Sequence, residues 1–366
     1  MGLEMEMRKD IKVLAMHLPQ YHAIPENDAW WGKGFTDWVN VKKARPIYKG
    51  HKQPVIPLNN NYYDMTDAST LQWQADLAKK YGVYGFCYYH YWFNGKMLLE
   101  KPCEILLQHP EIDEHYCFCW ANESWARTWD GKNTDILIKQ EFGGQDDWKK
   151  HIDYLIQFFE DPRYIRIENR PVVFFYSCAR ITQFNEMISY WNEVLAEHEI
   201  PEIYVVEFVN SFNSGKNDIN SDVLVEFEPH CATRCAISNI MKAKRVLCKK
   251  LGLTDFLSYD YVWKCLLKNK EDYGGKKLWR GAFVGFDNSP RKGKKGMIVK
   301  GSNPKKFYYY MKQLLNDTSR NYDDNFVVVN AWNEWAEGAI LEPTEQYKYD
   351  YLNAIRKLVS GQEHAV

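Results

Sequence analysis

The chain has 366 residues, which is enough for two ordinary domains or for one large barrel with insertions. Its 47 basic residues nearly cancel its 48 acidic residues, so the charge balance does not favour a polyanionic partner such as nucleic acid. Aromatic residues make up 16% of the chain and include 14 Trp. Much of this must be core, but a surplus of Trp beside polar residues suits a ligand with CH faces and hydroxyls.

The sequence also bears on the compartment. No apolar run is long enough to form a transmembrane segment. Residues 1–10 are charged and lack an apolar core, so no secretory signal is visible. The nine Cys are scattered, and several lie in apolar runs, as is typical of reduced, buried thiols. We therefore expect a cytoplasmic protein, or a periplasmic one if an export signal has been removed, and the oligomeric state stays open.

Eight apolar, β-rich runs recur along the chain, and most precede polar loops and helix-like patterns. The runs are residues 11–17, 83–91, 116–122, 171–176, 203–209, 223–228, 281–286 and 326–332, with helices predicted at 68–81, 145–161, 182–198 and 304–316. Nearly continuous hydrophobic strands separated by helices indicate a parallel sheet covered on both faces. Because there are eight, and because no glycine-rich phosphate turn follows the first, we predict a single (β/α)₈ TIM barrel domain over residues 1–366.

Two stretches look like insertions in that barrel. Residues 28–57 form a long Trp- and Gly-rich segment after the first strand, which suggests a wall or lid. Residues 231–277 exceed a simple connection and contain Lys-rich, helix-like sequence. The basic run 291–295 is interpreted as a solvated loop, with contact to phosphate or an anionic glycan as the alternative.

Residues 330–338 carry the clearest chemical signal. They follow the apolar run of the eighth strand and place Glu334 and Glu337 three positions apart, beside Trp and Asn. Two nearby carboxylates repel, so one is expected to keep its proton at neutral pH, as an acid/base pair requires. We predict that both are catalytic in glycoside cleavage, with a structural role at the barrel rim as the alternative.

Further polar and aromatic residues follow the other strands, and in such barrels these ends meet at one rim. Carboxylates and amides hydrogen-bond sugar hydroxyls, while indole faces stack on apolar sugar faces. The residues predicted to contact substrate are His17, Gln20, His22, Trp38, Tyr89, His90, Trp92, Asn94, Trp120, Asn122, Glu123, Trp125, Glu228, Asp287, Asn288, Asn333 and Trp335.

Several of these assignments have open alternatives. Glu123 follows Asn122 at a strand end, so it could donate a proton instead of holding a hydroxyl. The His and Trp residues could instead pack in the core, and Glu226 with Glu228 forms a reserve acid pair. Cys231 and Cys235 follow His230, but this spacing is loose and lacks a second ligand pair, so we expect no metal and no other cofactor.

Long motifs in this chain also carry a family resemblance. The segments HLPQYH, NDAWWGKGFTDW, YYHYWFNGK, CWANESWARTWDG, FDNSPR and NAWNEWAEGAILEP resemble the WbsX-type family, over about residues 11–354. That family belongs with glycoside hydrolase family 99-like proteins encoded in polysaccharide gene clusters. The resemblance implies a (β/α)₈ barrel and an oligosaccharide or polysaccharide substrate.

The eighth-strand signature is similar to that of family 99 itself, the endo-α-mannosidases and endo-α-mannanases. Carried over, Glu334 would be the base that deprotonates the sugar 2-hydroxyl, and Glu337 the acid that protonates the leaving oxygen. The implied route retains configuration through a 1,2-anhydro sugar. This chain departs at Ala336, where family 99 commonly has His, so the sugar is not implied.

The predicted function is therefore a glycoside hydrolase, endo-acting and retaining. The alternatives are a glycosyltransferase in cell-surface polysaccharide (O-antigen or capsule) biosynthesis and a non-catalytic glycan-binding barrel. The chain has no Gly-rich phosphate turn and no Asp-x-Asp triplet, which favours hydrolysis over transfer from a nucleotide sugar.

Overall fold

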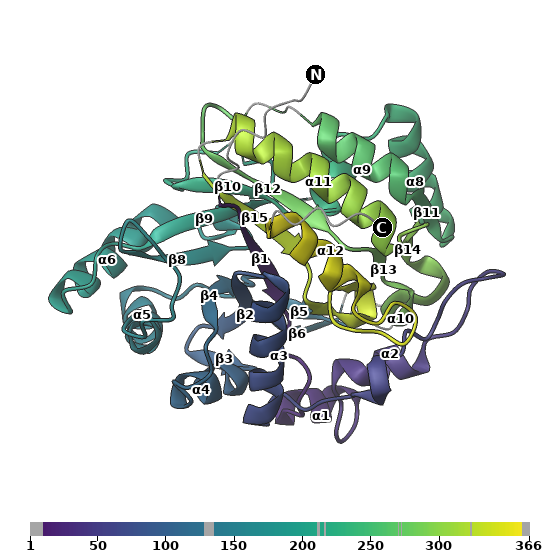
Figure 1. Ribbon diagram of the computed structural model, residues 1–366. Helices are drawn as coiled ribbons and strands as arrows, with labels where there is room; N and C mark the ends of the chain where they lie inside the picture. The colour runs from purple at the N-terminus through teal and green to yellow at the C-terminus, as the bar shows by residue number, and fades with distance from the viewer. Residues whose placement is uncertain are drawn as a thin grey trace.

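The computed structural model describes residues 10–127, 135–210, 213–215, 217–269, 271, 273–322 and 324–360 (Figure 1). Eight parallel strands form its centre, in the order β1-β15-β12-β10-β9-β8-β4-β2, and pairing of β1 with β2 closes the ring. They are β1 Lys12–His17, β2 Gly85–Phe93, β4 His115–Trp120, β8 Arg170–Phe175, β9 Tyr204–Val209, β10 Val223–Glu226, β12 Leu278–Phe283 and β15 Phe326–Asn330. The predicted (β/α)₈ barrel is confirmed, and each predicted apolar run overlaps one of its strands.

Helices cover the outside of this barrel (Figure 1). The predicted helices are present as α3 Ala68–Tyr81, α5 Gln145–Phe159, α6 Phe184–Glu197 and α11 Pro304–Asn321. The Asp67 carboxylate accepts a hydrogen bond from the Ser69 backbone N–H at the start of α3, and Gly82 ends that helix in the left-handed conformation. Further helices are α4 Lys101–Gln108, α9 Tyr259–Lys268 and α12 Asp350–Val359. No described helix is long and apolar enough to cross a bilayer.

The insertions have structure of their own. Residues 28–57 overlap α1 Pro25–Trp31 and α2 Asp37–Lys43, both at the lower end of the barrel in Figure 1. The second insertion holds α7 His230–Cys235, α8 Asn239–Leu251 and β11 Asp255–Ser258. β11 joins β14 Met297–Lys300 and β13 Phe286–Asp287 in a small side sheet, and α10 Ser289–Lys292 lies between β13 and β14 along the chain. The other short strands are β3 Lys96–Leu98, β5 Trp125–Ala126, β6 Ile136–Ile138, β7 Arg166–Ile167, β16 Asn333–Glu334 and β17 Ala339–Ile340.

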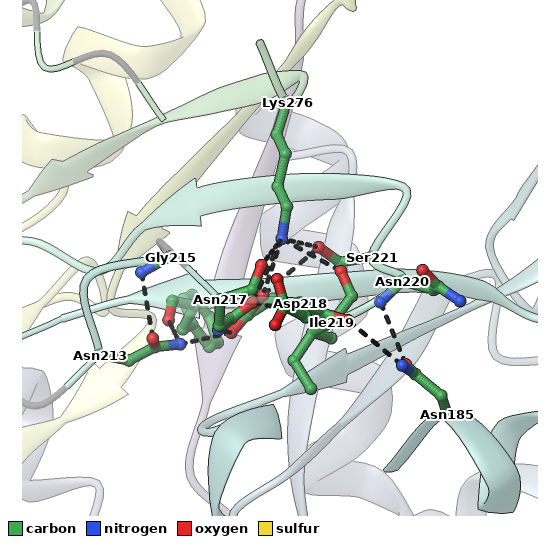
Figure 2. Close-up of polar contacts among 11 residues, drawn as sticks. Asn185, Asn213, Gly215, Asn217, Asp218, Ile219, Asn220, Ser221 and Lys276 are labelled. Atoms are coloured by element: carbon green, nitrogen blue, oxygen red, sulfur yellow. Dashed lines mark hydrogen bonds and ion pairs between the residues drawn. The ribbon is translucent and has the colours of Figure 1, made fainter. Parts of the chain in front are cut away.

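The connection from β9 to β10 contains no helix among its described residues. Instead, Glu207 on β9 is fully buried and accepts hydrogen bonds from the side chains of Asn213, Asn217 and Ser221. Figure 2 shows the Lys276 ammonium pointing into this loop, where it donates to oxygens of Asn217, Ile219 and Ser221. A polar network therefore covers this part of the barrel where an apolar helix face would otherwise pack.

The nine cysteines are all free thiols. Cys87, Cys103, Cys117, Cys119, Cys178 and Cys231 are buried, and the other three are half-buried. The Sγ atoms of Cys231 and Cys235 lie 3.7 Å apart, too far for a disulfide. Reduced thiols are therefore the form in this structure, as the scattered spacing predicted.

Candidate active site

A cavity of about 260 Å³ opens at the carboxyl ends of the barrel strands. It is lined by six of the predicted site residues, namely Gln20, Tyr89, Glu123, Trp125, Glu334 and Glu337. Its wall also contains Asn27, Trp31, Tyr91, Tyr176, Phe227, His230 and Arg291. The cavity thus combines carboxylates with amide and aromatic side chains contributed by loops far apart in the sequence.

The backbone that carries the two glutamates is held from several sides. Glu334 ends β16, and Glu337 lies in the short 3-10 helix Trp335–Glu337. The Asn333 side chain accepts from the Leu18 backbone N–H (2.7 Å) and donates to the Leu18 carbonyl (3.0 Å). The Tyr21 hydroxyl donates to the Asn333 carbonyl at 2.5 Å. These buried bonds tie the segment to the loop after β1, so its two carboxylates are positioned by a rigid support.

Arg291 joins the two carboxylates. Its guanidinium lies 2.8 Å from Glu337 Oε1 and 3.2 Å from Glu334 Oε2. It also pairs with the fully buried Asp37 on α2 at 3.0 Å. Burial alone would lower the pKa of Arg291, but these three carboxylates raise it well above its usual value. The basic run therefore is not a solvated loop at its first residue, because Arg291 is the counter-ion of the acid cluster.

One guanidinium cannot neutralise three carboxylates. Burial raises the pKa of Glu334 to about 8, Arg291 opposes that rise, and the charges of Glu337 and Asp37 add to it. Glu334 is 6% exposed, so loss of hydration outweighs the cation beside it. Burial therefore favours the protonated form of Glu334 in the substrate-free protein, whereas the family resemblance assigns the acid role to Glu337.

Two buried amides lack partners at this cavity. Both polar atoms of the Asn27 side chain and the Nε2 of Gln20 have no hydrogen-bond partner among the described residues. Their exposed fractions are 0% and 3%. Buried polar atoms are normally satisfied, so these orphans indicate a ligand or water that supplies hydroxyl groups. Asn27 was not among the predicted site residues, although it lies in the NDAWWGKGFTDW segment.

Glu123 lies at the edge of the same cavity. Its carboxylate pairs with Arg180 at 2.7 Å, on the loop after β8. Burial raises the pKa of Glu123, while Arg180 opposes that effect. The ion pair holds the Glu123 carboxylate at the cavity edge. Hydroxyl binding there stays a prediction, with proton donation as its alternative.

Aromatic residues form the cavity walls. Tyr89 and Tyr91 lie two positions apart on β2 and both line it, as alternation along a strand requires. Trp125 packs edge-on against Tyr91 with ring centroids 5.1 Å apart. Such walls present faces suited to the CH groups of a sugar ring.

The same alternation corrects three predicted contacts. The Trp92 indole donates to Asp147 of α5 at 3.0 Å, and its ring stacks on His151. His90 Nε2 lies 2.8 Å from His151 Nε2, so this imidazole also points to α5. The Trp120 ring on β4 stacks on that of Trp191 in α6, with ring centroids 6.3 Å apart. These side chains point away from the cavity and pack barrel against helices.

Other predicted contacts are buried supports. His17 bonds Gln74 of α3 at 3.2 Å, and His22 Nδ1 bonds the Pro19 carbonyl at 3.0 Å. The Trp38 indole donates to the Tyr63 carbonyl, and the Trp335 indole donates to Glu342 at 2.6 Å. Together with Asn333, these four side chains stabilise the loops at the carboxyl ends of the strands, near Glu334 and Glu337. None of the five lines the cavity.

The remaining predicted contacts lie elsewhere. Asn122 is fully buried and bonds both backbone groups of Ser177. Glu228 accepts from the Ala232 backbone N–H, and Asn288 accepts from that of Met297. Asp287 pairs with His51 at 2.7 Å. Asn94 is an exposed turn residue with φ of 47°. Each serves a local structural bond in this structure.

Among the described residues, one group of side chains could hold a metal ion. Ligand atoms of Glu226, Glu228 and Cys231 all fall within 4.8 Å of one another and are buried. Glu226 is already paired with the buried Arg280 at 2.8 Å. Arg280 also pairs with Asp317 at 2.6 Å, so its charge is divided between two carboxylates. The expectation that no metal binds here stays a prediction.

Comparison with known families gives one match over almost the whole chain. The model described as "Glycosyltransferase WbsX" matches residues 13–355. The uncharacterized protein WxcX of Xanthomonas campestris pv. campestris strain B100 is 35% identical over 355 residues, which is 95% of this chain and 49% of that protein. WxcX of strain ATCC 33913 matches to the same extent. The chain spans about half the length of these relatives.

Solved structures share the barrel at low identity. The GH99 endo-alpha-mannosidase of Bacteroides thetaiotaomicron superposes with a TM-score of 0.55 and 13% identity, over 97% of this chain and 98% of that chain. A structure described as a glycoside hydrolase-like protein gives 0.59 and 12%, over 97% and 95%. At such identities the likeness concerns the fold.

Proposed function

The chain belongs to the WbsX family, and from this premise we propose that it is a carbohydrate-active enzyme that cleaves a polysaccharide or oligosaccharide. The observation that carries the proposal is that Glu334 and Glu337 line one cavity and share the guanidinium of Arg291. The unpartnered amides of Gln20 and Asn27 support it, because sugar hydroxyls would satisfy them. Tyr and Trp walls add faces for the sugar ring.

The proposed reaction is endo-acting cleavage with retention. Glu334 takes the proton of the sugar 2-hydroxyl, whose oxygen attacks the anomeric carbon and forms a 1,2-anhydro sugar. Glu337 gives its proton to the departing glycosidic oxygen as that bond breaks. Glu337 then takes a proton from the water that opens the epoxide, and the epoxide oxygen recovers a proton from Glu334. The pair thus starts and ends with one proton.

This assignment requires the proton to lie on Glu337 in the reactive complex, although burial raises the pKa of Glu334 to about 8 in the free protein. The contrast is compatible with catalysis because two coupled acids share a macroscopic titration. A base with a raised pKa is also better matched to a sugar hydroxyl than an ordinary carboxylate.

The first experiment tests the pair. Glu337→Gln is expected to lower kcat on a natural glycan by roughly 100-fold or more, because no acid then protonates the leaving oxygen. An aryl glycoside with an activated leaving group needs no acid, so its first step should be partly restored. Glu334→Gln should lose activity on both substrates, since the base is required for each.

The matched control is Glu186→Gln on the exposed side of α6, which should behave as the wild type. Cleavage would be followed on a glycan panel, with NMR of the released anomer to establish retention. Full activity of both Glu334→Gln and Glu337→Gln would remove the pair from the mechanism. Aryl glycoside cleavage surviving in Glu334→Gln but not in Glu337→Gln would exchange the two roles.

Transfer of a sugar from an activated donor is the second candidate, favoured by the description of the matching family model. It predicts binding of nucleotide- or lipid-linked sugars in calorimetric titration and product formation only with an acceptor glycan. Tight glycan binding without turnover over long incubation would instead indicate a binding barrel.

A further inference from the structure

A second hollow of about 620 Å³ lies next to the candidate active site. It is enclosed by α8, by the segment that includes α10, and by residues leading into β11 and β14. Figure 1 shows α8 and β11 together at one side of the barrel. His230 lines both this hollow and the cavity of Glu334 and Glu337, so the two spaces are neighbours.

The charge around this hollow is strongly positive. Lys242, Lys249, Lys292 and Lys295 line it, and no carboxylate among the described residues forms a salt bridge with any of their ammonium groups. Arg245 also lines it but is paired with Asp255 at 2.6 Å. Four uncompensated cations gather here in a chain whose formal net charge is -1. Such a concentration attracts an anion.

Part of the lining of the hollow is apolar. Val246, Leu253 and Met297 line it together with the lysines. Val246 and Leu253 are each 55% exposed, although aliphatic side chains of this size are usually buried. Apolar faces under a basic rim match a sugar ring that bears a charged substituent.

The link to the acid pair runs through α10. Arg291 bonds Glu334 and Glu337, while the next residue, Lys292, lines the second hollow. A glycan that extends from the acids past His230 therefore enters the hollow that the lysines line. Neighbouring residues of α10 thus contact the acid pair and line the second hollow.

We propose that this hollow is a subsite for an anionic group, a carboxylate or a phosphate, on the glycan whose scissile bond lies at Glu334 and Glu337. The inference rests on the proposed function for the position of the scissile bond, and it names the substrate class as an acidic glycan. The lysines bind the anion while Val246 and Leu253 contact the ring that carries it.

The test replaces the four lysines together by Gln and measures binding by calorimetry at low salt. The probes are hexagalacturonate, its methyl ester, and inorganic pyrophosphate, which separate carboxylate, neutral and phosphate chemistry. The wild type should bind at least one of the two anions, and the variant should bind that anion at least about tenfold more weakly. The methyl ester should not distinguish the two proteins.

The control replaces Lys80, Lys150, Lys305 and Lys357 by Gln, which are exposed and line neither space. It changes the net charge equally and should leave anion binding within about twofold of the wild type. Equal loss in both variants, or no binding of either anion to the wild type, would overturn the proposal. So would lysine-dependent binding to phosphatidylglycerol vesicles without binding of the soluble anions, since that would indicate a membrane surface.

The readout is binding, so it stands apart from the catalytic experiment. Anion binding without any glycan cleavage would contradict the hydrolase proposal and leave the hollow as an anion-binding site. Cleavage of neutral and acidic glycans with equal kcat/KM would contradict the subsite and leave the hydrolase intact.

Discussion

The acid pair gives a pH dependence that follows from its surroundings. Because burial raises the pKa of Glu334 to about 8, the pair keeps one proton at neutral pH and loses it as the pH rises through that value. We expect kcat/KM to be bell-shaped, with its alkaline limb near pH 8, whichever glutamate carries the proton in the reactive complex. Initial rates measured from about pH 5 to about pH 10 check this. A kcat/KM that shows no decrease above neutral pH would contradict it.

Arg291 is the residue that the sequence assigned least well. A basic run is usually a solvated face, and its acid partners lie 43, 46 and 254 positions away in the sequence. No local period or turn signal could reveal that contact. Only the closing of the barrel brings α10 against α2 and the end of β16.

Replacing Arg291 by Gln has two expected consequences. The guanidinium lowers the pKa of Glu334, so its loss should move the alkaline limb of kcat/KM to higher pH. The carboxylates left without their cation should also lower the free energy of unfolding, on the order of 3 kcal/mol. Denaturant titration measures the second effect, with the exposed Arg320→Gln on α11 as the control. An unchanged alkaline limb would mean that Arg291 does not act on the pair.

At the level of single elements, the sequence predicted the positions of the strands better than it predicted which way their side chains point. Apolar runs located β2 and β4, but every residue of β2 is buried, so hydrophobicity alone did not separate its two faces. Period-two alternation did contain that information. Once Tyr89 faces the cavity, Tyr91 must as well, and His90 and Trp92 must face α5.

The β9–β10 connection is an element whose stability depends on polar groups. Lys276 donates to three residues of the loop shown in Figure 2 and lies 4.0 Å from the buried Glu207. Lys276→Met leaves Glu207 without its cation, so we expect the free energy of unfolding to fall on the order of 2 kcal/mol. Limited proteolysis should cut near residues 213–221 faster than in the wild type. The neighbouring Lys277→Met, at an exposed side chain, should change neither quantity.

At the scale of the whole molecule, the sequence predicted the barrel because strand number and alternation with helices are properties of the chain in order. It predicted the pair Glu334 and Glu337 for the same reason, since they adjoin one strand. It predicted the wall residues poorly because these come from loops of at least five strands, whose relative positions depend on closure. Asn27 is an example, since its orphaned amide is visible only once the cavity surrounds it.

Closure itself can be tested at Gly85, the first residue of β2. Gly85 pairs with Leu14 on β1 and with His115 on β4, so it lies at the seam where the ring closes. A Cβ there would lie 2.2 Å from the His115 carbonyl oxygen, and two hydrogen-bonded strands would have to separate to admit it. We expect Gly85→Ala to lower the free energy of unfolding by at least about 2 kcal/mol. Gly144→Ala, whose Cβ meets nothing within 4 Å, should cost less than about 1 kcal/mol. We expect the barrel to unfold as a unit, so chemical denaturation of Gly85→Ala should show one transition at lower denaturant. Loss of structure confined to β4 would contradict a role of this seam in the stability of the whole fold.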